Sequence, residues 1–156
     1  MAAALDLNVA TYESTKPLQL RPRVAKVVRV YDGDTVWLAF EHASEIIRCS
    51  TRLLGVDTAE IRTKNDAEKT AALGARDELR TLILGKLVHV ETEAAADKYG
   101  RLLATIWLQA EDPESTPSIN QRLVDRWGLA YDGGRKKLDV DWSSVPRNGT
   151  APLCDF

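Results

Sequence analysis

The stretch Val24-Ala-Lys-Val-Val-Arg-Val-Tyr-Asp-Gly-Asp-Thr-Val-Trp-Leu-Ala-Phe40 contains two β-prone runs that flank an Asp-Gly pair. In the first run, Val24–Tyr31, valine alternates with basic residues, and the second run, Thr35–Phe40, is rich in β-branched and aromatic residues. The pair Asp32-Gly33 between them tolerates the positive φ of a tight turn. This stretch therefore predicts a β-hairpin.

Three more runs predict strands. Ile46–Val56 alternates polar and apolar residues, as a half-buried strand does, and it follows the hairpin closely enough to form a meander. After a gap of about thirty residues, Leu87–Glu93 and Leu102–Leu108 predict a fourth and a fifth strand.

Two helices are expected between and after these strands. Apolar residues at helical spacing predict the first helix, with Asp66 as its N-cap and Gly85 as its stop. Ser118-Ile-Asn-Gln121 has the pattern of a capping box and opens a second helix that ends at Gly128. The order of three strands, a helix, two strands and a helix predicts an α+β fold built on a five-stranded OB-fold β-barrel.

The composition is that of a folded soluble protein. The 156 residues include 21 Lys+Arg and 23 Asp+Glu, for a formal net charge of -2, which argues against a protein that coats nucleic acid. Nothing resembles a secretory signal or a run of about 18 apolar residues, so we expect a cytoplasmic monomer that does not enter a membrane. Cys49 and Cys154 have no partner at zinc-ligand spacing.

We expect an N-terminal extension (1–22), one domain (23–131) and a loop-rich tail (132–156).

Two clusters of carboxylates lie near predicted turns. Asp32 is typical of the turn itself, whereas Asp34 begins a strand that favours an apolar or β-branched residue. Asp57 and Glu60 follow the third strand at a spacing that also fits a helix N-cap, and Arg52 lies on that strand. Oxygen ligands of this kind suit Ca²⁺ or Mg²⁺ better than zinc or copper.

A third cluster, Asp97-Lys-Tyr-Gly-Arg101, precedes the fifth strand. Such a pentapeptide is typical of a charged turn. It also fits a phosphate-binding loop, because the guanidinium of Arg101 offers a planar fork of donors.

Four motifs occur in a compatible order along the chain. They are Val30-Tyr-Asp-Gly-Asp-Thr-Val36, Arg52-Leu-Leu leading into Asp57-Thr-Ala-Glu60, Asp97-Lys-Tyr-Gly-Arg101, and Asn120 with Leu123-Val and Gly128-Leu-Ala130. Together they resemble the staphylococcal-nuclease-like (thermonuclease) domain over roughly residues 23 to 131. The resemblance implies a Ca²⁺-dependent nuclease, built on an OB-fold barrel, that hydrolyses DNA or RNA.

The resemblance also implies a role for each matching residue. Asp34 and Asp57 would supply carboxylate oxygens to Ca²⁺, and Thr58 its backbone carbonyl; Asp32 matches an acidic residue outside the metal's direct ligands. Glu60 matches the proposed general base. Arg52 and Arg101 match residues that bind the scissile phosphate. Lys98 and Tyr99 match residues that contact the nucleotide's terminal phosphate.

The chain departs from the family pattern at several places. Ala59 replaces the usual proline, which is expected to loosen the loop that carries Glu60, and Ile61–Leu73 differs from the prototype's substrate loop. Beyond Ala130 the two sequences diverge. Here Tyr131 is a candidate for stacking on a base, and Lys136 is a candidate for contacting the nucleic-acid backbone.

Two other functions remain open from the sequence. A non-catalytic OB-fold module would bind nucleic acid or protein, although a decayed nuclease should lack some of the residues retained here. A metal-free ribonuclease would use His42 and His89, but no flanking residue positions either histidine. The choice between DNA and RNA, and any inhibitor or regulatory partner, are likewise open.

Overall fold

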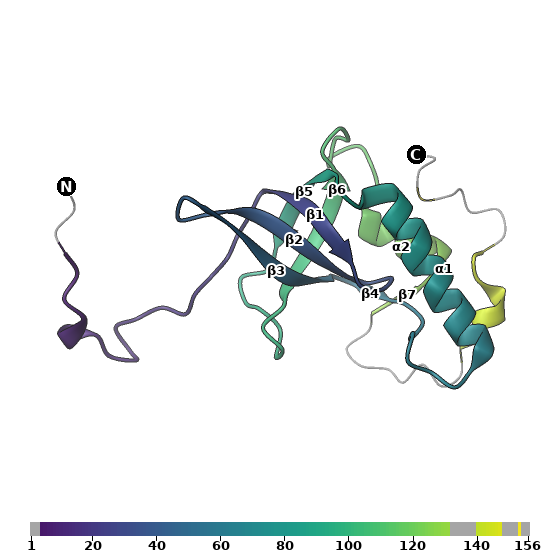
Figure 1. Cartoon of the computed structure of the whole chain (residues 1–156), viewed down its shortest axis with the longest axis horizontal. Helices are drawn as coiled ribbons and strands as arrows, with labels where there is room; N and C mark the ends of the chain where they lie inside the picture. Colours follow the sequence, from purple (N-terminus) through teal and green to yellow (C-terminus); the bar gives the residue numbers. More distant parts are fainter. Residues whose placement is uncertain (1–3, 132–139, 148–152, 154–156) are drawn as a thin grey trace.

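The computed structural model describes residues 4–131, 140–147 and 153, and its centre is a closed β-barrel (Figure 1). The barrel strands are β1 (Val24–Val30), β2 (Thr35–His42), β3 (Glu45–Leu53), β5 (Leu87–Thr92) and β6 (Leu102–Leu108). Their order around the barrel is β1-β2-β3-β6-β5.

The strand pairing explains the closure. β1, β2 and β3 form an antiparallel meander, β5 pairs antiparallel with both β6 and β1, and β3 pairs in parallel with β6. A barrel leaves no unpaired edge along these strands. The five-stranded OB-type barrel predicted from the order of the elements is therefore confirmed.

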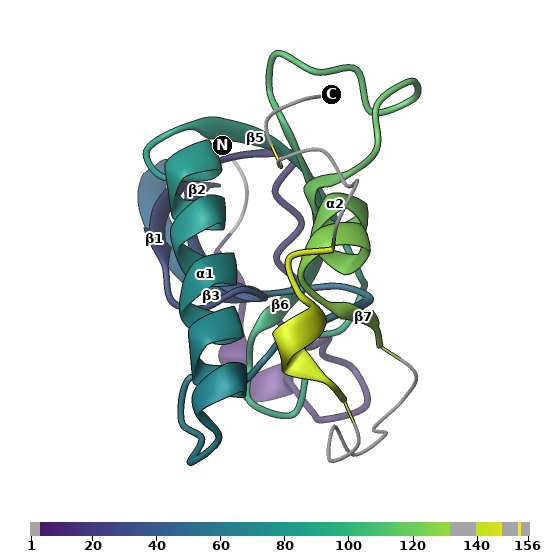
Figure 2. The same ribbon diagram turned by 90° about the vertical axis from the view of Figure 1, so that its right-hand side faces the viewer.

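The structure also describes two α-helices, α1 (Asp66–Ile83) and α2 (Ile119–Arg126). Both lie at one end of the barrel, whereas the segment before β1, with the short 3₁₀ helix η1 (Leu7–Val9), runs away from it on the other side (Figure 1). A second 3₁₀ helix, η3 (Trp142–Ser144), packs against α1 (Figure 2). No helix among the described residues is long and apolar enough to cross a membrane.

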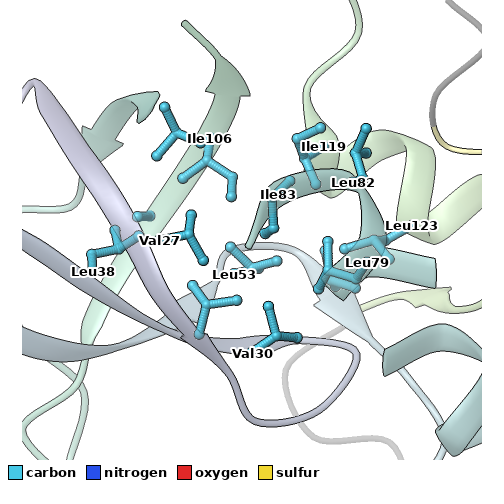
Figure 3. Packing of buried hydrophobic residues seen from close by; sticks show 14 of the residues in the cluster. Val27, Val30, Leu38, Leu53, Leu79, Leu82, Ile83, Ile106, Ile119 and Leu123 are labelled. Carbon is cyan, nitrogen blue, oxygen red and sulfur yellow. The ribbon is translucent and has the colours of Figure 1, made fainter. Parts of the chain in front are cut away.

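The core joins the barrel to the helices. Val27, Leu38, Leu53 and Ile106 fill the barrel end, and they meet apolar side chains of the two helices in one buried cluster (Figure 3). The helix side chains in this cluster are Ala75, Leu79, Leu82 and Ile83 of α1 and Ile119 and Leu123 of α2. Burial of this face stabilises α1 more than its own helix propensity does.

The predicted start of α1 and the predicted capping box of α2 each need a correction. The N-cap of α1 is Asn65 rather than Asp66, because Asn65 has an extended backbone and its side chain accepts a hydrogen bond from the Glu68 N–H. Ser118 caps α2 as predicted. However, the Gln121 side chain donates to Asp125 at 2.8 Å instead of completing the capping box.

The third predicted strand is broken near its end. β3 ends at Leu53, and Gly55 adopts a φ of +75°, a conformation that glycine adopts without steric cost. The chain then forms a short strand, β4 (Val56–Asp57), which leaves the barrel and pairs with β7 (Leu129–Ala130). The break directs the residues after Val56 toward the end of α2.

The turn between β1 and β2 is wider than the tight turn expected from Asp32-Gly33. Gly33 does not adopt a positive φ. Instead, the Tyr31 and Asp32 N–H groups donate to the Thr35 carbonyl oxygen, and the Asp32 carboxylate accepts from the Asp34 N–H at 3.1 Å. The side chain of Asp32 therefore shapes this turn.

The predicted division at residues 22 and 131 stays a prediction. Most of the tail predicted for 132–156 lies outside the described residues, as do Lys136 and Cys154.

The buried side chain of Asn120 joins α2 to two strands. Its amide nitrogen donates to the carbonyl oxygens of Leu54 and Ala104, both at 2.9 Å, and its oxygen accepts from the Ile106 N–H at 3.1 Å. The Ala104 carbonyl oxygen also accepts from the Leu54 N–H at 2.8 Å, so Asn120 adds to a backbone link between the end of β3 and β6. Loss of three hydrogen bonds made by one buried side chain is costly.

We therefore predict that Asn120→Ala lowers the free energy of unfolding by about 2–4 kcal/mol, measured by urea denaturation. The neighbouring substitution Gln121→Ala is the control, because it removes only an exposed contact with Asp125 and should cost less than about 0.5 kcal/mol. Equal losses in the two variants would contradict this role of Asn120.

Candidate active site

Three loops meet around Asp34, at the start of β2. The Asp34 carbonyl oxygen accepts from the Leu53 N–H at 2.8 Å, which joins the β1–β2 turn to the end of β3. In the β2–β3 register, Thr35 lies opposite Arg52. The Thr35 hydroxyl also accepts from Arg101 Nη1 at 3.5 Å, so the loop between β5 and β6 reaches the same place.

The carboxylate of Asp34 is buried, with the residue 4% exposed. One of its oxygens, Oδ1, forms an ion pair with Arg52 and accepts from the Thr35 hydroxyl at 3.1 Å. The other, Oδ2, accepts from the Thr58 backbone N–H at 3.3 Å and from the Thr58 hydroxyl at 3.2 Å. Burial of a charged carboxylate is tolerated because each oxygen has donors.

Arg52 links two carboxylates. Its guanidinium pairs with Asp34, and its Nη2 donates to Asp57 Oδ1 at 3.3 Å and to the Val56 carbonyl oxygen at 2.9 Å. Burial by itself would lower the pKa of Arg52, but Asp34 and then Asp57 outweigh burial and raise it. The guanidinium thus stays charged between the two acids.

Gly33 is required by close packing rather than by its conformation. A Cβ on this residue would lie 2.8 Å from Thr58 Oγ1, 3.0 Å from Thr58 Cγ2 and 3.1 Å from the Cβ of Ala75 on α1. The missing side chain therefore lets Thr58 reach Asp34.

Arg101 is oriented by Asp97, a residue to which we assigned no role from the sequence. Asp97 accepts from the backbone N–H groups of Tyr99 and Arg101, both at 2.9 Å, and from Arg101 Nε at 2.7 Å. Burial would raise the pKa of Asp97, but the hydrogen bonds from Arg101 and Tyr99 outweigh burial and lower it. In the sequence, the four-residue spacing of Asp97 and Arg101, with Gly100 between them, was the signal that could have indicated this ion pair.

A cavity of about 560 Å³ lies beside these residues. Arg52 and Arg101 both line it, together with the exposed rings of Tyr99 and Tyr131 and the side chain of Lys98. The Lys98 ammonium and the Arg101 guanidinium lie 5.0 and 5.4 Å from the centroid of the Tyr99 ring. The cavity therefore combines several cations with two aromatic faces.

The backbone of Glu60 contacts the first turn of α1. The residue is exposed, two positions beyond Thr58, and its N–H donates to Glu68 Oε1 at 3.2 Å. The preceding Ala59 is buried against Ala71 and Ala72 of α1 and against Trp142. The structure thus brings together Asp34, Arg52, Asp57, Thr58 and Arg101, with Glu60 on the adjoining loop.

Comparison with known proteins assigns the family. Residues 50–137 match the family model described as "Staphylococcal nuclease homologue". This chain belongs to the staphylococcal nuclease family. The matched segment includes the end of β3, the Glu60 loop and the Asp97–Arg101 loop, so the family match covers most of the candidate site.

Two curated relatives support the family assignment. A protein named "Thermonuclease" from Staphylococcus hyicus is 32% identical over 87 residues, which is 55% of this chain and 49% of the relative. "Protein ParB" from Escherichia coli is 30% identical over 136 residues, or 84% of this chain and 67% of the relative. The chain thus spans about half the length of the thermonuclease and two thirds of the second relative.

The donor atoms of this staphylococcal nuclease homologue fit a hard divalent cation. Burial, and next the nearby Asp34 carboxylate, raise the pKa of Asp32 to about 6. Burial is the larger cause, and the smaller one, the Asp34 carboxylate, is negative charge that a bound cation would offset. Among the described residues, no three His, Cys, Asp or Glu side chains are grouped closely enough to hold a metal. The ligand set expected here is smaller, with two carboxylates and a carbonyl.

The raised pKa of Asp32 predicts how stability depends on pH. Because the folded pKa of about 6 exceeds the ordinary value of 3.8, the folded chain retains a proton that the unfolded chain loses. The contribution of Asp32 to wild-type stability therefore falls as pH rises from about 4 to beyond 6. Without metal, Asp32→Asn should be more stable than wild type at pH 7 by on the order of 1–2 kcal/mol, and the difference should vanish near pH 4.

Urea denaturation in EDTA at several pH values measures this difference. Asparagine keeps an oxygen that can accept from the Asp34 N–H, so the turn is retained. A difference that is the same at every pH would show that ionisation of Asp32 is not its cause.

Proposed function

We propose that this chain is a Ca²⁺-dependent nuclease that hydrolyses phosphodiester bonds of DNA or RNA. The observation that carries the proposal is that Arg52 and Arg101 line one cavity, while Arg52 also contacts the two acids Asp34 and Asp57. Two guanidinium groups beside a pair of carboxylates suit an anionic substrate and a divalent cation together.

The residues that would hold Ca²⁺ are Asp34, Asp57 and the backbone carbonyl of Thr58. Ca²⁺ prefers oxygen ligands of this kind. When bound there, it would supply positive charge close to the phosphate and make a bound water easier to deprotonate. One guanidinium, that of Arg52, already contacts both carboxylates, which supports a shared cation site beside them.

Arg52 and Arg101 would stabilise the transition state. A phosphodiester is already anionic, and attack by water adds charge to its oxygens. Donors placed where that charge develops stabilise the transition state more than the substrate. On binding substrate, Arg52 would exchange contacts with Asp34 and Asp57 for the phosphate, whereas Asp97 would keep Arg101 in place.

Glu60 would act as the general base that holds and deprotonates the attacking water. A positioned base contributes typically 10²–10⁴-fold to the rate. Neither arginine is a good proton donor, because a guanidinium group holds its proton too tightly to give it to a leaving group near neutral pH. Both arginines would therefore stabilise the negative charge that develops on the phosphate.

Substrate contacts would come from the cavity wall. Lys98 and Tyr99 would contact the nucleotide's terminal phosphate, and Tyr131 would stack on a base. The exposure of both tyrosine rings, 71% for Tyr99 and 52% for Tyr131, leaves their faces open to a nucleotide.

The proposal is tested by incubating plasmid DNA and single-stranded RNA with the chain in Ca²⁺, Mg²⁺ or EDTA. We predict cleavage with Ca²⁺ and none with EDTA. Arg52→Lys and Arg101→Lys should each lose about 10²-fold or more in kcat/KM, because lysine keeps the charge but not the fork of donors. Arg48→Lys is the matched control, since Arg48 is exposed on the same strand as Arg52.

Other outcomes would favour the rival functions. Tight binding of nucleic acid without cleavage under any metal would indicate a non-catalytic OB-fold module. Cleavage that persists in EDTA and is lost in His42→Ala or His89→Ala would indicate a metal-free ribonuclease. Near-normal turnover in both lysine variants would contradict the roles of Arg52 and Arg101.

A further inference from the structure

Glu68, in the first turn of α1, holds the loop that carries Glu60. Its Oε1 accepts from the Glu60 backbone N–H at 3.2 Å, and its Oε2 accepts from the Thr63 hydroxyl at 2.7 Å. One half-buried carboxylate therefore contacts the loop at two points. Charged acceptors form stronger hydrogen bonds than neutral ones do.

The same loop is closed by the cap of α1. Asn65 Oδ1 accepts from the Glu68 N–H at 3.0 Å, and the Asn65 N–H donates to the Thr63 hydroxyl oxygen at 3.2 Å. Thr63 thus accepts from Asn65 while it donates to Glu68. The hydrogen bonds join residues 60, 63 and 65 to the helix start, so the loop and the first turn of α1 form one unit.

Packing holds the loop from its other end. Ala59 is 4% exposed, and it lies in a small apolar cluster with Ala71 and Ala72 of α1 and with Trp142 of η3. Although Ala59 replaces the family's usual proline, it is fixed by burial. Glu60 therefore follows a buried residue and donates its own N–H to α1.

We propose that Glu68 is a positioning residue for Glu60, an inference that rests on the proposed function. The Glu60 side chain extends from a backbone that Glu68 contacts directly, at the Glu60 N–H. A general base must lie within hydrogen-bond reach of its water, and a displacement of about 1 Å can cost about 10²-fold in rate. Glu68 acts on the base through the backbone and touches neither metal nor substrate.

The test compares Glu68→Ala with Asp66→Asn. Asp66 is an exposed acid in the same first turn, so its substitution removes a similar charge from the helix start and leaves the Glu60 loop intact. We expect Glu68→Ala to lower kcat by about 10–100-fold, with KM and Ca²⁺ affinity within about twofold of wild type. Asp66→Asn should keep its kcat within about twofold.

A conservative variant keeps the test valid if Glu68→Ala does not fold. Glu68→Gln retains one acceptor oxygen for the Glu60 N–H, so its kcat should lie between those of wild type and Glu68→Ala. Circular dichroism and the melting temperature establish whether each variant is folded. Wild-type kcat in folded Glu68→Ala, or an equal loss of kcat and Ca²⁺ affinity in Glu68→Gln, would overturn the inference.

A double-mutant cycle separates positioning from a general structural effect. If Glu68 acts through Glu60, then Glu60→Gln/Glu68→Ala should be no slower than Glu60→Gln alone. Losses that multiply would show that Glu68 acts by another route, and they would also overturn the inference.

A readout independent of activity distinguishes this inference from the proposed function. Amide hydrogen exchange at the Glu60 N–H should be faster in Glu68→Ala than in wild type, and unchanged in Asp66→Asn. If the wild-type chain cleaves no nucleic acid, the proposed function fails and the positioning role fails with it, even where the exchange result confirms the backbone link. If the wild type cleaves and exchange at Glu60 is unaffected by Glu68→Ala, only the positioning inference fails.

Discussion

The arrangement of the site depends on the ion pair and the hydrogen bonds made by the buried carboxylate of Asp34. An ionised carboxylate removed from water must receive hydrogen bonds or a countercharge. Here the donors come from three segments: Thr35 on β2, Arg52 on β3 and Thr58 beyond β4. The contacts of this one carboxylate therefore join the β1–β2 turn to Arg52 at the end of β3 and to Thr58 after β4. Gly33 provides the space for Thr58 to approach.

The barrel supplies the frame for this network. Parallel pairing of β3 with β6 brings the loop before β6, with Arg101, next to the end of β3, with Arg52. The break at Gly55 then directs Asp57 back under the Arg52 guanidinium. Arg52 therefore lies between Asp34 and Asp57, with Arg101 on the neighbouring loop, an arrangement that would suit the anionic substrate of the proposed reaction.

Regular elements were predictable from the sequence because their signals are local. Alternation in Val24–Tyr31 located the first strand, the run Leu102–Leu108 located the fifth, and Gly85 marked the end of α1. The errors concern features that depend on distant partners. Gly33 is needed because Thr58 and Ala75 lie against it, and no property of the turn sequence reveals those neighbours.

The candidate residues were predicted from their resemblance to a family, whereas the residues that support them were not. Asp97 and Glu68 hold Arg101 and Glu60 through hydrogen bonds that form only in the folded chain. Asn65 and Asp66 are both good N-caps, and only the geometry of the Glu68 N–H distinguishes them.

The most direct test of this account is calorimetric titration of Ca²⁺ into the wild-type chain and into folded Asp34→Asn, with cleavage measured on the same samples. We predict that one Ca²⁺ binds per wild-type chain and that cleavage reaches half of its maximum at the concentration that half-saturates binding. In Asp34→Asn, the Ca²⁺ affinity and the cleavage rate should each fall about 10-fold or more. Unchanged Ca²⁺ affinity in that variant, or full cleavage by the wild type in EDTA, would contradict it.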